Sequence, residues 1–172
     1  MDINKLIHLL PVEEGSYYFG FSGFAIESKK TFEDAQLGYR THPNGSDLTG
    51  SGEGDWKKSW YVIGRDTVVG DPFFVDLSTE NFPIYTAMHG AGNWNPTLVS
   101  KDLSGFFSSI NYLQKKSNQD SDLIEPDENT ISDEVELGKI YKHLISLCGE
   151  DASFFWECFI EQHQDWITES EE

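Results

Sequence analysis

The sequence predicts an α+β fold, with a largely antiparallel sheet flanked by helices and an αα-hairpin at the C-terminal end. Short apolar segments at 60–63, 73–77 and 83–88 are rich in aromatic and β-branched residues. The connections between them are too short for parallel crossovers, so they favour antiparallel pairing. Apolar residues recur at helical spacing over 137–148 and 152–167, with only a short turn between the two stretches.

The N-terminal part predicts smaller elements. Residues 3–10 have helical apolar spacing, with Asp2 as cap and Pro11 as the stop. The aromatic segment 17–26 predicts a strand whose two glycines indicate a bulge or close backbone packing. Thr31-Phe32-Glu33-Asp34 fits a capping box and predicts a short helix through about Leu37. Residues 41–58, rich in glycine and polar residues, predict a long loop.

The second half continues with a short strand at 97–99. Leu103, Phe106, Phe107 and Ile110 then form one apolar helix face, with Ser100 or Asp102 as the cap. We interpret residues 1–117 as one domain and 118–131 as an acidic linker. Residues 132–168 form the helical hairpin, which must bury its apolar stripes and is therefore expected to pack on the same domain.

Charge is distributed unevenly along the chain. The formal net charge is −18; residues 1–119 hold 14 acids and 10 bases, whereas residues 120–172 hold 16 acids and 2 bases. Such a surface repels nucleic-acid phosphates and anionic lipid and attracts basic proteins. No stretch has the length of a membrane span, and the apolar run before Pro11 is too short for a secretion signal. We therefore expect a cytoplasmic protein with neither nucleic-acid nor membrane partners.

Sequence motifs for catalysis or metal binding are absent. The five histidines form no HExxH or HxH pattern, and Cys148 and Cys158 form no CxxC pair. His143 and His163 lie beside or within apolar helix stripes, which predicts packed and satisfied rings. The Gly50–Gly54 segment lacks the lysine of a phosphate-binding loop. We expect a protein without enzymatic activity, cofactor or metal.

Three aspartates surround a predicted turn between two strands. Asp66, Asp71 and Asp76 are five residues apart, which allows a carboxylate pair or a cation site. The simpler interpretation is turn chemistry: Asp66 and Asp71 bind local backbone, and Gly70 has a positive φ angle. The acids between 120 and 136 lack the ligand spacing and central glycine of a calcium loop.

A partner-binding surface is predicted from charge and from loop aromatics. Trp56 and Trp94 fall in predicted loops, where a large aromatic residue is a candidate anchor. Eight acids precede the helical hairpin and form a candidate steering group for a basic partner: Asp120, Asp122, Glu125, Asp127, Glu128, Asp133, Glu134 and Glu136.

Residues 60–113 resemble the core of the SMI1/KNR4, or SUKH, superfamily. The matching segments are Trp60–Gly64, Gly70–Leu77, Pro83–Tyr85 and the loop His89–Pro96. Within these segments the motif residues are Gly64, Gly70, Asp71, Asp76, His89 and Pro96. A helix bearing Leu103, Phe106 and Phe107 closes the unit. The resemblance implies a curved sheet and binding without catalysis; bacterial members of that superfamily are often immunity proteins for toxins, many of them nucleases.

Three hypotheses follow. The first is an immunity protein that neutralises a cognate toxin domain, whose basic surface the acids would attract. The second is a general interaction, scaffold or regulatory domain with no toxin partner. The third, which the missing motifs disfavour, is an enzyme or small-ligand binder using the His89–Pro96 loop with Asp71 and Asp76.

Overall fold

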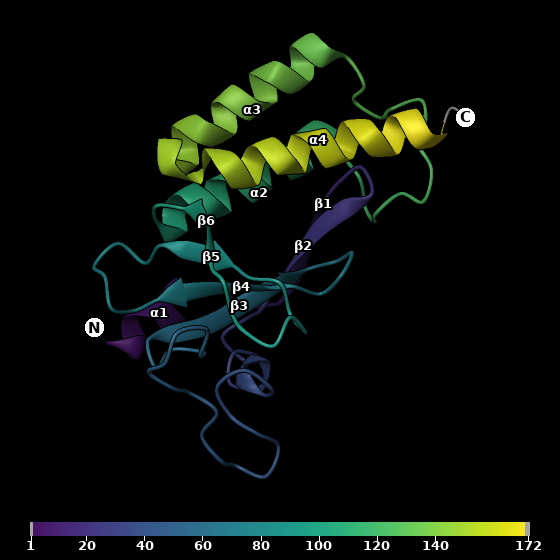
Figure 1. Cartoon of the computed structure of the whole chain (residues 1–172). Helices are drawn as coiled ribbons and strands as arrows, with labels where there is room; N and C mark the ends of the chain where they lie inside the picture. Colours follow the sequence, from purple (N-terminus) through teal and green to yellow (C-terminus); the bar gives the residue numbers. More distant parts are fainter. Residues whose placement is uncertain (1, 171–172) are drawn as a thin grey trace.

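The computed structural model describes residues 2–170 and contains one curled, six-stranded sheet (Figure 1). Every neighbouring pair of strands is antiparallel, and the strands follow one another in chain order. This confirms the α+β class and the antiparallel pairing of the three central segments. The strands are β1 (Gly15–Phe19), β2 (Ser22–Ile26), β3 (Trp60–Asp66), β4 (Pro72–Asp76), β5 (Ile84–Thr86) and β6 (Thr97–Ser100).

The aromatic segment 17–26 is a tight hairpin rather than a single strand. Phe19 pairs with Ser22, so Gly20 and Phe21 form a two-residue turn in which Gly20 has φ +62°. Gly23 matches the expected close packing, because a Cβ there would lie 2.9 Å from the Tyr17 carbonyl oxygen. The expected bulge lies elsewhere, in β3, where the register with β4 shifts between Val62 and Gly64.

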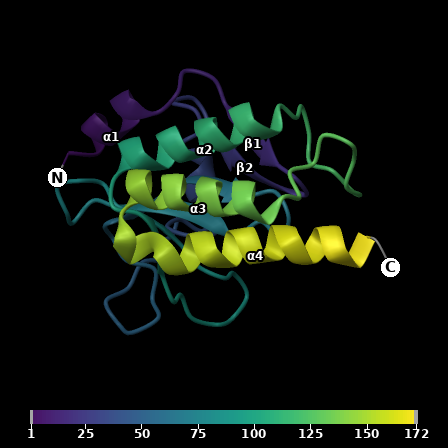
Figure 2. The same ribbon diagram turned by 90° about the horizontal axis from the view of Figure 1, so that it is seen from above.

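Three long helices cover one face of the sheet: α2 (Leu103–Ser117), α3 (Glu134–Cys148) and α4 (Ser153–Ser170). Figure 2 shows them side by side, with the shorter α1 (Ile3–Leu9) beyond α2. Asp102 caps α2 by accepting a hydrogen bond from the Gly105 N–H. Gly149, at φ +98°, ends α3, and the 3₁₀ turn η2 (Glu150–Ala152) leads into α4. The predicted αα-hairpin is therefore present.

The larger core lies between the helices and this face of the sheet. Phe24, Phe73 and Ile84 point into it from the strands and are at most 2% exposed. Phe106 of α2 and Trp156 of α4 complete the packing, and the Trp156 indole N–H donates to the Val99 carbonyl. Each buried aromatic side chain of this size removes a large apolar area from water and so stabilises the domain.

A second, smaller core covers the opposite face of the sheet. Trp60 and Phe74 point to that side, and the long loop 41–58 folds over them and places Trp56 on top. Trp56 is only 2% exposed and donates its indole N–H to the Trp60 carbonyl. The expectation that Trp56 is a surface anchor is therefore wrong, because the sheet has a second apolar face that needs a cover.

The segment after β2 corrects the expected helix at 31–37. It forms a turn followed by the 3₁₀ helix η1 (Asp34–Gln36). Ser28, rather than Thr31, caps the turn, because its hydroxyl accepts hydrogen bonds from the N–H groups of Lys30 and Thr31. Thr31 supports the cap by accepting from the Ser28 N–H.

Candidate protein-docking surface

The acidic segment 118–131 has no helix or strand, yet it is fastened to the tip of the β1–β2 hairpin. The Gln119 side chain accepts from the Gly20 N–H at 2.7 Å and donates to the Gly20 carbonyl at 2.9 Å. The Leu123 N–H donates to the same carbonyl. The segment interpreted as a linker is thus docked on the domain.

The same segment is held from its other side by α4, and Figure 1 shows it beside the C-terminal half of that helix. The Trp166 indole N–H donates to the Ile124 carbonyl at 3.1 Å, and His163 Nε2 donates to the Ile131 carbonyl at 2.9 Å. His163 is buried, and burial lowers the pKa of its imidazole below the ordinary value. Its Nδ1 has no hydrogen-bond partner, so the expectation of a fully satisfied ring is wrong. These hydrogen bonds anchor the backbone that carries the acids of this segment.

The eight predicted steering acids are not equivalent. Asp120, Asp122, Glu125 and Glu128 are exposed. Two further exposed acids act as caps. Asp127 accepts from the Asn129 N–H in a turn, and Asp133 accepts from the Glu136 N–H at the start of α3. Glu134, also exposed, lies in the first turn of α3, where a carboxylate favours the helix dipole.

Glu136 departs from the expectation of an exposed, free acid. It is partly buried and forms ion pairs with Lys116 at 2.6 Å and Lys139 at 3.5 Å. The hydrogen bond from Lys116 lowers the pKa of the Glu136 carboxyl. Because two lysines already compensate its charge, Glu136 belongs to the α2–α3 interface rather than to a free surface.

A stripe of acids on α4 is a feature that the sequence reasoning missed. Glu157, Glu161, Asp165 and Glu169 are spaced by four residues and are all exposed. That spacing places them along one face of the helix. The sequence contains two periodic patterns over this helix: the apolar positions that predict its buried face, and acids at every fourth residue.

The acids beyond residue 119 are almost all uncompensated. Of the 14 acids in residues 120–170, Glu136 is the one that lies within salt-bridge distance of a lysine or arginine. The hydrogen bonds from Trp166 and His163 attach segment 118–131 to α4, and the acidic stripe lies on the exposed face of the same helix. The C-terminal part of the chain therefore concentrates negative charge on backbone that is helical or hydrogen-bonded to the domain.

The β3–β4 turn has the chemistry expected of Asp66 and Gly70, but Asp71 differs. Asp66 accepts hydrogen bonds from the N–H groups of Val68, Val69 and Asp71, and Gly70 has the predicted positive φ, at +80°. Asp71 was expected to bind the turn itself. Its Oδ1 instead accepts from the His89 N–H at 2.9 Å and lies 2.6 Å from His89 Nδ1. This pair joins the β3–β4 turn to the loop that follows β5.

The remaining motif residues have structural positions. Gly64 is required by close packing, because a Cβ there would lie 2.5 Å from the Ala25 carbonyl oxygen. Asp76 accepts from the Ser78 N–H at the end of β4. Pro96 is exposed directly before β6.

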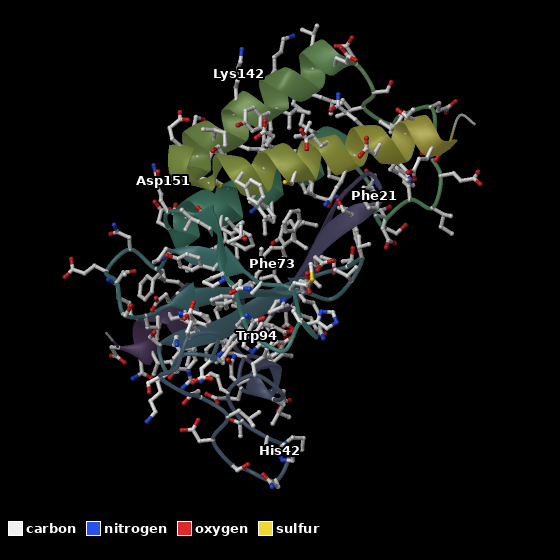
Figure 3. All side chains as sticks on the ribbon, in the orientation of Figure 1. Phe21, His42, Phe73, Trp94, Lys142 and Asp151 are labelled. Atoms are coloured by element: carbon white, nitrogen blue, oxygen red, sulfur yellow. The ribbon has the colours of Figure 1, made fainter. Side chains whose placement is uncertain are left out.

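Trp94 is the loop aromatic residue that keeps some exposed surface. Figure 3 places it below the sheet, on the side opposite the helices. The Trp94 ring packs on the Trp56 ring, with centroids 5.0 Å apart, and the Trp94 backbone N–H donates to the Gly54 carbonyl. It therefore closes the edge of the second core, far in the fold from the acidic region.

Metal-binding clusters and membrane-spanning helices are both absent from residues 2–170. No group of three or more His, Cys, Asp or Glu side chains within residues 2–170 is placed to hold a metal ion. In the same part of the chain, no helix has the length and apolar character required to cross a membrane.

Comparison of the chain with protein-family models, curated proteins and solved structures gives no match.

Proposed function

We propose that this chain is a non-enzymatic, cytoplasmic protein-binding domain that takes a basic protein partner, and that the partner is a toxin domain which it neutralises. The resemblance of residues 60–113 to SUKH immunity proteins supports the toxin, and a nuclease, with its basic substrate cleft, has the matching charge. The proposal includes no cofactor.

One observation carries the proposal. The acids of residues 120–170 lie on docked or helical backbone, and all but Glu136 lack a basic partner among the described residues. Charges of one sign raise the local concentration of an oppositely charged partner and accelerate encounter. A rigid charged surface also keeps its geometry when the partner arrives, which reduces the entropy lost on binding.

The test measures association with a purified candidate toxin domain, chosen from the products of the genes that adjoin this chain's gene. Four exposed acids without capping tasks are neutralised together, in the variant D120N/D122N/E125Q/E128Q. The matched control, E14Q/E33Q/E53Q/E80Q, removes the same charge from exposed positions in the N-terminal part. We expect the first variant to lower the association rate roughly tenfold at low salt and to flatten its salt dependence, with little effect on dissociation.

Two results would count against the proposal. Equal slowing by both variants would show that net charge acts without a defined surface. Unchanged association in the first variant would show that the acidic segment serves solubility alone. Binding without inhibition of any activity of the partner would favour a scaffold or regulatory role over immunity.

A further inference from the structure

A groove of about 630 Å³ lies between α4 and the turns at the ends of the β1–β2 and β3–β4 hairpins. Its apolar lining includes Phe21, Val68, Val69, Phe159 and Trp166. Figure 3 shows Phe21 beside the C-terminal half of α4, with Phe73 beneath the helix. This volume lies within the range of pockets that enclose a drug-sized ligand, so the groove has room for an inserted side chain.

The walls of the groove are fixed by packing. On the helix side, the Trp166 ring lies 5.5 Å from Phe21 and the Phe159 ring lies 5.7 Å from Phe24, measured between centroids. On the turn side, the Asp66 carboxylate accepts the N–H groups of Val68 and Val69, each at 2.8 Å. An apolar contact made here would therefore require little ordering of the protein.

Val68 and Val69 present apolar surface to solvent, at 51% and 61% exposure. Turn positions ordinarily carry polar residues. Two adjacent exposed valines, held by the Asp66 carboxylate, share one groove lining with the half-buried rings of Phe21 and Trp166, so their exposure is not scattered. Such a patch is typical of the anchoring part of an interface.

Carboxylates stand on both walls of the groove. Asp66 and Asp71 belong to the β3–β4 turn, whereas Asp165 and Glu169 project from α4. No lysine or arginine lines the groove. The apolar floor therefore lies between negative rims, and low-dielectric walls strengthen the field between them.

We propose that this groove receives an apolar side chain of the partner that is flanked by lysine or arginine residues. The inference rests on the proposed function and specifies how the partner is held: apolar contact fills the groove while the flanking cations face the carboxylates. The acids of segment 118–131 act at longer range, and the groove supplies the short-range contact.

The test uses two probes of equal charge: a short peptide built of Lys-Leu-Lys triplets, and its analogue with serine in place of leucine. Each is titrated into isotopically labelled protein, and binding is followed by NMR. We expect the leucine peptide to bind about tenfold more tightly, because only it places apolar side chains in the groove. Its shifts should centre on the amides of Val68 and Val69 and on the Trp166 indole N–H.

Paired variants locate the contact. V68S/V69S should reduce leucine-peptide affinity to that of the serine peptide, whereas V135S, at an exposed valine of α3, should not. D165N/E169Q should weaken binding of the leucine peptide more than E157Q/E161Q does, although both remove two charges from α4. All these side chains are largely exposed, so the fold is expected to remain intact.

The outcomes separate this inference from the proposed function. Equal affinity of the two peptides, with shifts confined to segment 118–131, overturns the groove and leaves acidic steering in place. If neither peptide binds, the groove is not a site for such segments. The rate measurements on the four-acid variants then remain an independent test of the proposed function.

Discussion

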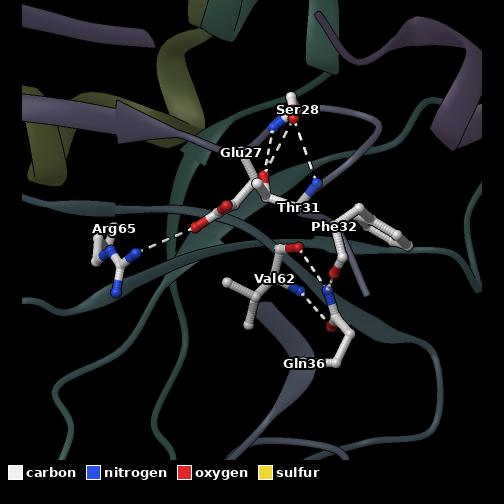
Figure 4. A network of polar contacts seen from close by, with 7 residues as sticks. All are labelled: Glu27, Ser28, Thr31, Phe32, Gln36, Val62 and Arg65. Atoms are coloured by element: carbon white, nitrogen blue, oxygen red, sulfur yellow. Dashed lines mark hydrogen bonds and ion pairs between the residues drawn. The ribbon is translucent and has the colours of Figure 1, made fainter. Parts of the chain in front are cut away.

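Gln36 replaces a missing stretch of β-strand, which makes it the most informative position at which to test the fold. Strand β2 pairs with β3 only as far as Ile26 opposite Gly64. Beyond that point Gln36 Nε2 donates to the Val62 carbonyl at 2.9 Å, and the Val62 N–H donates to Gln36 Oε1 at 3.0 Å (Figure 4). Gln36 Nε2 also donates to the Phe32 carbonyl. The side chain is 4% exposed.

Gln36→Met keeps the length and approximate volume of the side chain and removes its hydrogen-bonding groups. The Val62 N–H and C=O then stay buried without partners, and each unsatisfied group costs about 1–3 kcal/mol. Burial of the more apolar thioether offsets part of that loss. We expect the free energy of unfolding to fall by about 2–4 kcal/mol, which lowers the Tm by roughly 4–16 °C in a domain of this size.

The measurement is urea unfolding at neutral pH, followed by tryptophan fluorescence and circular dichroism. The midpoint should fall while the slope m stays constant, since the same surface is exposed on unfolding. Gln162→Met makes the same chemical change at an exposed position of α4 and serves as the control. A loss below about 0.5 kcal/mol for Gln36→Met would refute the reasoning, because surface changes fall in that range.

Three further predictions concern the backbone, pH and thiols. Gly70→Val should destabilise the fold by about 1 kcal/mol or more from backbone strain alone, since nothing lies within 4 Å of its Cβ position. The control Gly138→Ala, in open space on α3, should instead stabilise the fold by about 0.5–1 kcal/mol. An unchanged Tm for Gly70→Val in thermal melts would contradict the strain argument. Burial lowers the His163 pKa from 6.5, so below that pH the unfolded chain binds a proton that the folded chain does not bind. Urea unfolding should therefore show a free energy of unfolding that falls as the pH drops below about 6.5. If His163→Gln leaves this pH dependence unchanged, His163 is not its source. Cys148 is buried, and burial raises the pKa of its thiol, so a thiol reagent should modify Cys158 alone in the folded protein. Rapid labelling of the folded Cys158→Ser variant would be inconsistent with the buried position of Cys148.

The sequence was sufficient where local chemistry decides structure. Apolar segments with short connections predicted β3, β4 and β5, and helical periodicity with a short intervening turn predicted the α3–α4 hairpin. Asp2 and Gly70 were also identified correctly, and Asp102 was one of the two caps considered for α2, because caps and positive φ angles depend on nearby residues.

Prediction failed where a side chain serves a distant part of the fold. Trp56 looked like a loop residue, but the second face of the sheet lies across the chain and needs an apolar cover. Asp71 looked like a turn residue, but its partner His89 follows another strand. Gln119 and Gly20, 99 residues apart, fasten a segment whose composition alone indicated a linker. Sequence spacing contains no information on such contacts.

The α4 stripe has an energetic consequence within the fold. Like charges at i, i+4 destabilise a helix by about 0.2–0.5 kcal/mol per pair, and Glu157, Glu161, Asp165 and Glu169 form three successive pairs, or about 1 kcal/mol. The buried face of α4, with Trp156 fully enclosed, offsets this cost. Solubility requires net charge but not this spacing, since the same acids placed away from i, i+4 positions would supply equal charge without the repulsion within the helix. Asp165 and Glu169 belong both to this stripe and to the rim of the groove. The unfavourable charges therefore lie where an approaching basic segment would compensate them, and binding would recover the stability that the isolated fold gives up.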